Sequence, residues 1–129
     1  MTYLAVLIGG LVGTGLRLAT SALVVPGSDF PWATLLINVV GSFVLGFLVA
    51  RVWPTAPAWL RAGLGTGVLG SFTTFSAVVV SLLTLTAAGL TLLAAVYLIV
   101  SLVLGLAAAL AGVRLGVPAP VDPPIRADE

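Results

Sequence analysis

The sequence contains no cysteine and no histidine. These absences exclude disulfides, thiolate and imidazole metal sites, cysteine nucleophiles and histidine general bases. Charge is scarce as well, since only 7% of the residues are charged and the net charge is +1. So small a positive charge gives no basis for a nucleic-acid partner. The sequence therefore excludes most enzyme chemistry and predicts that the protein is neither an enzyme nor a nucleic-acid binder.

Apolar residues make up most of what is there. They account for 60% of the chain, and the mean hydropathy is +1.28. Soluble domains carry about a quarter charged residues, so this chain lacks the polar surface that such a core would need. We therefore predict an integral membrane protein in contact with lipid. Its first apolar stretch has no basic segment before it and exceeds the length of a signal peptide, so we interpret it as a retained span.

Proline, glycine and charged residues divide the apolar sequence into four pieces, each about as long as the roughly 20 residues that cross a bilayer. They predict a four-helix transmembrane domain over residues 1–117, with spans at residues 4–25, 32–53, 58–83 and 90–113. The last connection, near residues 84–89, is the least distinct. Residues 118–129 combine proline and acidic residues, and they predict a disordered polar C-terminal tail.

The arginines predict the orientation of the chain in the membrane. With four spans both termini share a side, and that side carries Arg51, Arg61, Arg114 and Arg126. The opposite loops, residues 26–31 and 84–89, carry no arginine or lysine. Short cytoplasmic loops collect such residues. We therefore expect a multi-pass membrane protein with a fixed topology and both termini in the cytoplasm.

Glycines recur at intervals that suit close helix packing. Gly9 and Gly13 lie four residues apart in the first span, and Gly63 and Gly67 do so in the third. In lipid, such pairs allow two helix backbones to approach each other. We interpret them as packing residues.

A few polar side chains interrupt the apolar spans, where each needs a partner. Arg17 lies two-thirds along the first span and either faces a water-filled vestibule or serves packing and topology. Asn38, in the second span, offers two donors and an acceptor, which would also suit bonding between helices. Tyr97 and Ser101 in the fourth span share one helix face.

The densest polar group lies within the third span. Gly70, Ser71, Thr73, Thr74 and Ser76 occur there together with Phe72 and Phe75. A continuous helix gains little from so many hydroxyl and β-branched residues, so we expect a local break. Backbone carbonyls freed by a break are suitable ligands for a hard cation such as sodium. The alternative is a continuous helix bent by serine and threonine bonds to its own backbone.

Three segments together resemble the signatures of a known family, the Fluc/CrcB fluoride channels. They are Gly9–Arg17 (GGLVGTGLR), Thr34–Gly46 (TLLINVVGSFVLG) and Gly70–Ser76 (GSFTTFS), in the family's order and spacing. The resemblance extends over all four spans and includes Tyr97 and Ser101.

The resemblance implies a passive fluoride-selective channel of the bacterial inner membrane that exports fluoride from the cytoplasm and reduces its toxicity. It implies an inverted, antiparallel dimer with a structural sodium ion at its centre, held by the backbone carbonyls of Gly70 and Thr73. The implied vestibule residue is Arg17, and the implied fluoride path is lined by Asn38, Phe75, Ser76, Tyr97 and Ser101.

Two features depart from the family pattern. Where the family usually has a second glycine, threonine and phenylalanine, this chain has Ser71, Ala77 and Val78, so Val78 marks a degenerate pore position. The arginine bias also favours one orientation, whereas an inverted homodimer needs a chain that inserts both ways. Both features suit one half of an inverted heterodimer with a homologous subunit, and the choice between homodimer and heterodimer stays open.

Two other functions remain as alternatives. The chain would be a non-conducting assembly subunit of an inverted heterodimer if its polar residues only join helices. It would be a small multidrug or cation exporter if it carried a membrane-buried carboxylate, but the only acid between residues 1 and 121 is Asp29, in a loop.

Overall fold

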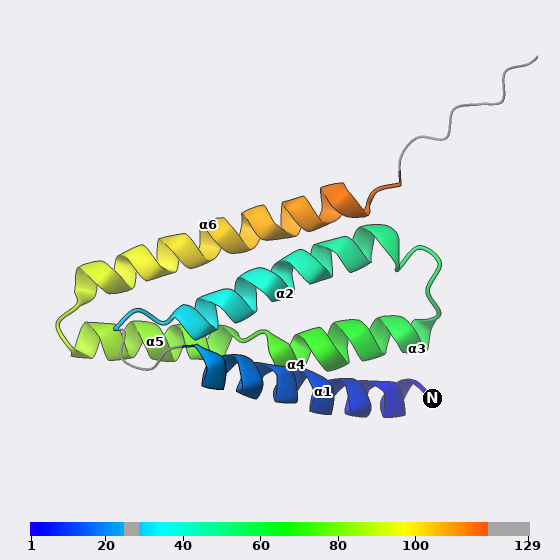
Figure 1. Ribbon diagram of the computed structural model, residues 1–129, viewed down its shortest axis with the longest axis horizontal. Helices are drawn as coiled ribbons and strands as arrows, with labels where there is room; N and C mark the ends of the chain where they lie inside the picture. Colours follow the sequence, from blue (N-terminus) through cyan, green and yellow to red (C-terminus); the bar gives the residue numbers. More distant parts are fainter. Residues whose placement is uncertain (25–28, 119–129) are drawn as a thin grey trace, which may run out of the picture.

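The computed structural model describes residues 1–24 and 29–118, and over these residues the protein is a bundle of four membrane-length helices (Figure 1). The spans are α1 (Thr2–Leu23), α2 (Trp32–Arg51), a third span over Ala58–Ala87, and α6 (Thr91–Gly116). The predicted all-helical membrane fold is thereby confirmed. The predicted tail at 118–129 and part of the predicted turn at 26–31 lie outside the described residues.

The third span is composite rather than one regular helix. It begins with α3 (Ala58–Arg61), widens into a π-helix, η1 (Ala62–Leu69), and tightens again in α4 (Gly70–Phe72). After Thr73 and Thr74 it resumes as α5 (Phe75–Ala87). The predicted interruption is confirmed, and it occupies these two threonines (Figure 1). The preceding π-helix was not predicted from the sequence.

The first pair of helices, α1 and η1, is in contact backbone to backbone. A Cβ atom added at Gly9 would collide with the carbonyl oxygen of Gly63, and one added at Gly13 would collide with that of Val68. At Gly67 it would lie 2.9 Å from the carbonyl oxygen of Val6. The packing role predicted for these glycines is confirmed, because only glycine allows this approach. We call this contact the α1–η1 seam.

A second seam joins α2 to α6. A Cβ atom at Gly46 would collide with the carbonyl oxygen of Ala109, and one at Gly112 with that of Phe43. A Cβ atom at Gly116 would lie 2.8 Å from the Cβ atom of Ala50 and 2.9 Å from the carbonyl oxygen of Phe47. The sequence analysis did not single out Gly112 and Gly116, although their four-residue spacing is the same signal that identified Gly9 and Gly13.

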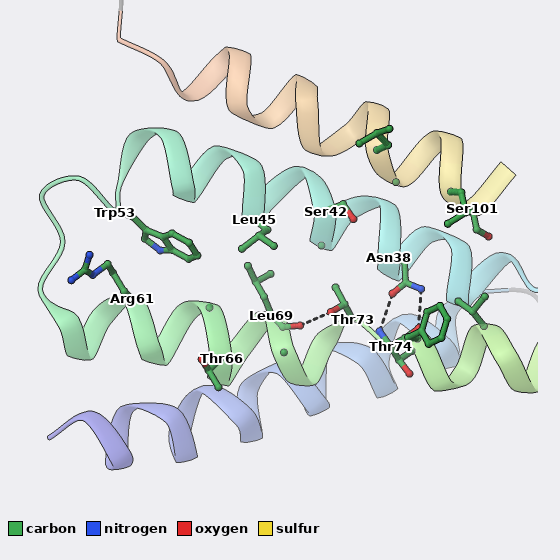
Figure 2. Close-up of a pocket in the computed structure, with 18 of the residues that line it drawn as sticks. Asn38, Ser42, Leu45, Trp53, Arg61, Thr66, Leu69, Thr73, Thr74 and Ser101 are labelled. Carbon is green, nitrogen blue, oxygen red and sulfur yellow. Dashed lines mark hydrogen bonds between the residues drawn. The ribbon is translucent and has the colours of Figure 1, made fainter. Parts of the chain in front are cut away.

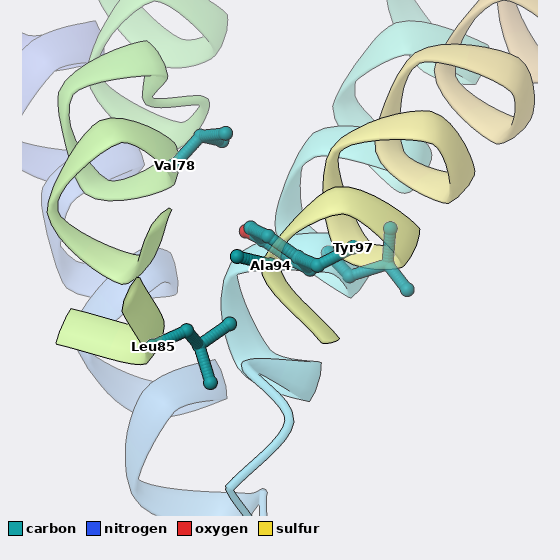
Figure 3. Packing of buried hydrophobic residues seen from close by; sticks show 5 residues of the cluster. Val78, Leu85, Ala94 and Tyr97 are labelled. Atoms are coloured by element: carbon teal, nitrogen blue, oxygen red, sulfur yellow. The ribbon is translucent and has the colours of Figure 1, made fainter. Parts of the chain in front are cut away.

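Side chains rather than backbones fill the contact between α5 and α6. Its buried cluster comprises Leu35, Val78, Leu85, Ala94 and Tyr97, four of which are labelled in Figure 3. Elsewhere α6 exposes large apolar residues, among them Leu92, Ile99, Leu110 and Leu115. A surface this apolar is suited to contact with lipid.

Both ends of the described chain lie at the same end of the bundle. The N-terminus, the connection between α2 and α3, and the C-terminal end of α6 are together at the right of Figure 1. The last turns of α2, α3 and α6 lie at that end and carry Arg51, Arg61 and Arg114, respectively. Arg126, the fourth arginine of the predicted cytoplasmic side, lies outside the described residues.

Candidate functional site

The interruption of the third span consists of two extended residues. Thr73 has φ −76° and ψ 155°, and Thr74 has φ −153° and ψ 119°. Threonine is β-branched and fits extended backbone better than helix, which explains why the chain breaks here. The helix is therefore interrupted and not merely bent, so the polar backbone of two residues needs partners outside the helix.

Asn38 supplies those partners from α2. Its side-chain Nδ2 donates to the carbonyl oxygen of Thr74 at 3.0 Å, and its Oδ1 accepts from the Thr74 amide at 2.9 Å (dashed lines in Figure 2). The side-chain amide thus pairs with the backbone as a neighbouring β-strand would. We call this pair of bonds the Asn38 clamp. It leaves one N–H of the asparagine uncommitted.

The threonine hydroxyls complete the local bonding. Thr73 directs both its amide and its hydroxyl to the carbonyl oxygen of Leu69, at 2.9 and 2.8 Å. A hydroxyl bond to the helix's own backbone was the basis of the alternative prediction, a continuous but bent helix. Here the bond is present at the end of α4, and the helix is nevertheless interrupted. The Thr74 hydroxyl accepts from the Ala77 amide at 3.2 Å and so caps the start of α5.

These bonds deprive two carbonyls of their helical donors. In a regular helix the Thr74 amide would donate to Gly70 and the Ala77 amide to Thr73. Instead the first donates to Asn38 and the second to the Thr74 side chain. Because α5 begins only at Phe75, the break leaves four carbonyl oxygens without helical donors, those of residues 70 to 73. Of these four residues, Gly70 and Thr73 line the groove described next.

A groove of about 1080 Å³ runs between the α2–α6 pair and the third span. It brings together six predicted site residues, namely Asn38, Gly70, Thr73, Phe75, Val78 and Ser101. Gly41 also lines it, and a Cβ atom there would collide with the Thr73 side chain. Released carbonyls and apolar side chains therefore share one open groove (Figure 2).

Two further polar candidates lie at a second cavity, of about 470 Å³, whereas Tyr97 lines neither cavity. Arg17 and Ser76 line it together with three hydroxyl residues that the sequence analysis did not select: Ser21, Thr34 and Ser81. Thr74 lines both cavities, so the break lies between them. The spacing of Thr34 and Asn38, one turn apart on the same helix, was an available signal for Thr34.

Tyr97 and Ser101 carry hydroxyls that are buried without a hydrogen-bond partner among the described residues. The Tyr97 side chain is fully buried, and the side chains of Thr34, Ser81 and Ser101 lie around its hydroxyl. A buried hydroxyl without a partner destabilises a protein unless something else bonds to it. Both hydroxyls therefore retain hydrogen-bonding capacity, and Ser101 does so on the wall of the groove.

Phe75 and Val78, one turn apart on α5, differ sharply in exposure. The Phe75 ring is 77% exposed, whereas Val78 is 6% exposed and packs in the cluster with Tyr97. Phe75 thus exposes most of its aromatic ring, whereas Val78, labelled in Figure 3, packs within the bundle.

The described residues contain no cluster of histidine, cysteine, aspartate and glutamate that could hold a metal ion. The candidate metal ligands at the break are therefore backbone carbonyl oxygens, which are suitable for hard cations. The released carbonyls of Gly70 and Thr73 therefore fit a sodium ion by their chemistry.

The family model and the relatives that match this sequence point to the same protein family. The family model described as "CrcB-like protein, Camphor Resistance (CrcB)" matches residues 4–113. A relative in Deinococcus radiodurans named "Fluoride-specific ion channel FluC" is 46% identical over 121 residues, covering 88% of this chain and 94% of that protein. One of the same name in Xanthomonas euvesicatoria is 41% identical over 112 residues, covering 84% of each chain. "Fluoride-specific ion channel FluC 1" of Mycobacterium bovis is 41% identical over 107 residues, covering 81% of each chain.

Proposed function

The chain belongs to the CrcB family, and from that premise we propose that it is a subunit of a fluoride-selective channel through which fluoride leaves the cytoplasm passively. The observation that carries this function is the family match over residues 4–113, which spans all four helices and the break. The family consists of ion channels, so this multi-pass membrane protein is not an enzyme.

The fluoride path in this proposal is lined by Asn38, Phe75, Ser76, Tyr97 and Ser101. Fluoride is small and strongly hydrated, so donors along the path must replace its water. The unpaired hydroxyls of Tyr97 and Ser101 and the uncommitted N–H of Asn38 support this role. The exposed Phe75 ring supports a contact in which its positive edge faces the anion.

Arg17 belongs to the vestibule of the proposed path. It lines the second cavity with Ser76, one of the path residues. A cation at the mouth raises the local concentration of an anion, while a neutral interior avoids holding it too tightly.

A structural sodium ion is the proposed cofactor, with the carbonyl oxygens of Gly70 and Thr73 as its ligands. Their diverted helical donors and their position on the groove support this assignment. Two oxygens from one chain leave a sodium ion short of ligands. A second, inverted subunit related by a twofold axis would add the same two.

The proposed assembly is an inverted dimer. The exposed Phe75 ring and the open groove support it, because both leave apolar surface beside the path uncovered. The proposed location is the inner membrane with both termini cytoplasmic, and this rests on the three arginines at one end of the bundle.

Fluoride efflux from liposomes that contain the purified chain tests the function. We expect efflux from the unsubstituted chain and its loss in Asn38→Asp, because a carboxylate in the path repels the anion. Leu92→Met, at an exposed position of α6 outside both cavities, is the control and should conduct normally. Absence of fluoride efflux from the unsubstituted chain, whether alone or with a homologous partner, would contradict the proposal.

The second candidate is an assembly subunit of an inverted heterodimer with one degenerate pore. Val78 and the one-sided arginines favour it. Expression of the chain alone in a fluoride-sensitive bacterium tests it, since full rescue of growth without a partner would refute an obligate heterodimer. The cation exporter has no such support, because Asp29 is an exposed loop residue.

A further inference from the structure

The Asn38 clamp lies beside the proposed sodium site, and we propose that Asn38 and Thr74 are positioning residues that hold the Gly70 and Thr73 carbonyls free for the cation. This inference rests on the proposed function, because it presumes the sodium ion. It assigns to Asn38 a role distinct from donating to fluoride. It also assigns a role to Thr74, which is not part of the proposed fluoride path.

Two backbone amides at the break, those of Thr74 and Ala77, each have a choice between a backbone carbonyl and a side-chain oxygen as acceptor. A carbonyl in a helix is satisfied by the amide four residues later, and a satisfied carbonyl is a poorer cation ligand. At this break each amide has been given a side-chain acceptor instead. Asn38 Oδ1 takes the Thr74 amide at 2.9 Å, and Thr74 Oγ1 takes the Ala77 amide at 3.2 Å.

Each side-chain acceptor therefore accounts for one released carbonyl. Without Asn38, the Thr74 amide would donate to the carbonyl oxygen of Gly70, its acceptor in a regular helix. That bond would extend α4 and occupy the Gly70 carbonyl. Without the Thr74 hydroxyl, the Ala77 amide would turn to Thr73 in the same way. The bonds that shape the break thus leave carbonyls without helical donors on two residues that line the groove.

Asn38 has two separable functions under this inference. Its Oδ1 and one N–H hold Thr74, while its remaining N–H is available to an anion. An aspartate at this position keeps an acceptor for the Thr74 amide but has no N–H for fluoride. A leucine keeps the approximate volume but offers neither.

The experiment measures sodium-dependent thermal stabilisation of the purified full-length protein beside fluoride efflux. Sodium is titrated against N-methylglucamine at constant ionic strength, and the midpoint of the stabilisation is recorded. We expect Asn38→Leu and Thr74→Val each to raise the sodium midpoint by about tenfold, the effect of losing one or two hydrogen bonds that keep a ligand free. Asn38→Asp keeps the acceptor for the Thr74 amide and adds a negative charge, so it should not raise the sodium midpoint, while it should lose fluoride efflux.

Two controls separate positioning from general destabilisation. Leu35→Ala removes buried volume in the cluster and should lower the melting temperature without moving the sodium midpoint. Ser42→Ala, one turn after Asn38 on the groove side of α2, should change neither. If Asn38→Leu does not fold, Thr74→Val still tests the inference, because it leaves Asn38 intact.

The outcomes distinguish the inference from the function on which it rests. An unchanged sodium midpoint in both Asn38→Leu and Thr74→Val would overturn the positioning role. A loss of the sodium response in Asn38→Asp would also overturn it, since that variant keeps the acceptor. An unsubstituted protein without any sodium response would remove the sodium site and this inference, whereas fluoride efflux from it would leave the channel function standing.

Discussion

The two glycine seams and the groove between them are built in opposite ways from the same apolar sequence. In the seams, backbones of α1 and η1, and of α2 and α6, touch with no room for a methyl group. In the groove, the same helices separate and leave about 1080 Å³ lined by carbonyls, hydroxyls and an exposed aromatic ring. The seams therefore act as a rigid frame, since helices in lipid associate by close packing rather than by the hydrophobic effect. The groove carries the polar groups that the frame holds in place.

The largest effect on stability is expected from breaking a seam. In Gly13→Ala, the added methyl group would collide with the carbonyl oxygen of Val68. This oxygen belongs to the backbone, so it cannot move away by a change of side-chain rotamer. We expect a loss of at least about 3 kcal/mol, because overpacking here displaces a whole helix. Gly15→Ala is the control two residues away, where a Cβ atom meets nothing within 4 Å. It should gain up to about 1 kcal/mol from helix propensity. Chemical denaturation in detergent measures both, and equal losses would contradict the seam.

A smaller effect is expected where a glycine faces the groove. Gly41→Ala would meet the Thr73 side chain rather than backbone. That side chain can rotate at the expense of its bond to Leu69, so we expect a loss of about 1–2 kcal/mol. Gly105→Ala is its control, since a Cβ atom there would lie 3.8 Å from the Ser42 hydroxyl, an ordinary contact. The same denaturation measurement applies, and a loss as large as that of Gly13→Ala would erase the distinction between seam and groove.

The smallest effect on stability is expected from Tyr97→Phe. It removes a buried hydroxyl that has no partner within the described chain, so the free energy of unfolding should stay within about 1 kcal/mol or rise slightly. Fluoride efflux should nevertheless fall about tenfold, because the path loses a donor to the anion. Stability and efflux that fall together would show that the hydroxyl serves the frame and not the path.

Much of the frame could be predicted from the sequence. Proline, glycine and charged residues marked the four spans, and the four-residue spacing of Gly9 and Gly13 identified one seam. The concentration of hydroxyl residues after Gly70 identified the interruption of the third span. These features are local, so a single sequence is enough to reveal them.

The details of the groove could not be predicted in this way. Several threonines and serines occur around Gly70, and the break falls on Thr73 and Thr74 because Asn38 bonds to that particular backbone from another helix. The break thus follows from a contact between residues far apart in the chain. The π-helix, which lies against α1, was not predicted from the sequence. The roles of the individual path residues and of sodium stay predictions.

The order in which the Asn38 clamp is synthesised bears on how the protein enters the membrane. Asn38 precedes Thr74 by 36 residues, so it leaves the ribosome first and is already within the bilayer when the third span arrives. A broken helix is a poor candidate for insertion on its own, because its exposed amide and carbonyl would meet hydrocarbon. Asn38 on the preceding span can bond to the Thr74 amide and carbonyl as the third span inserts, which shields these polar groups from lipid. Reversing the order of these two helices by circular permutation should therefore impair biogenesis even if the finished bundle were equally stable.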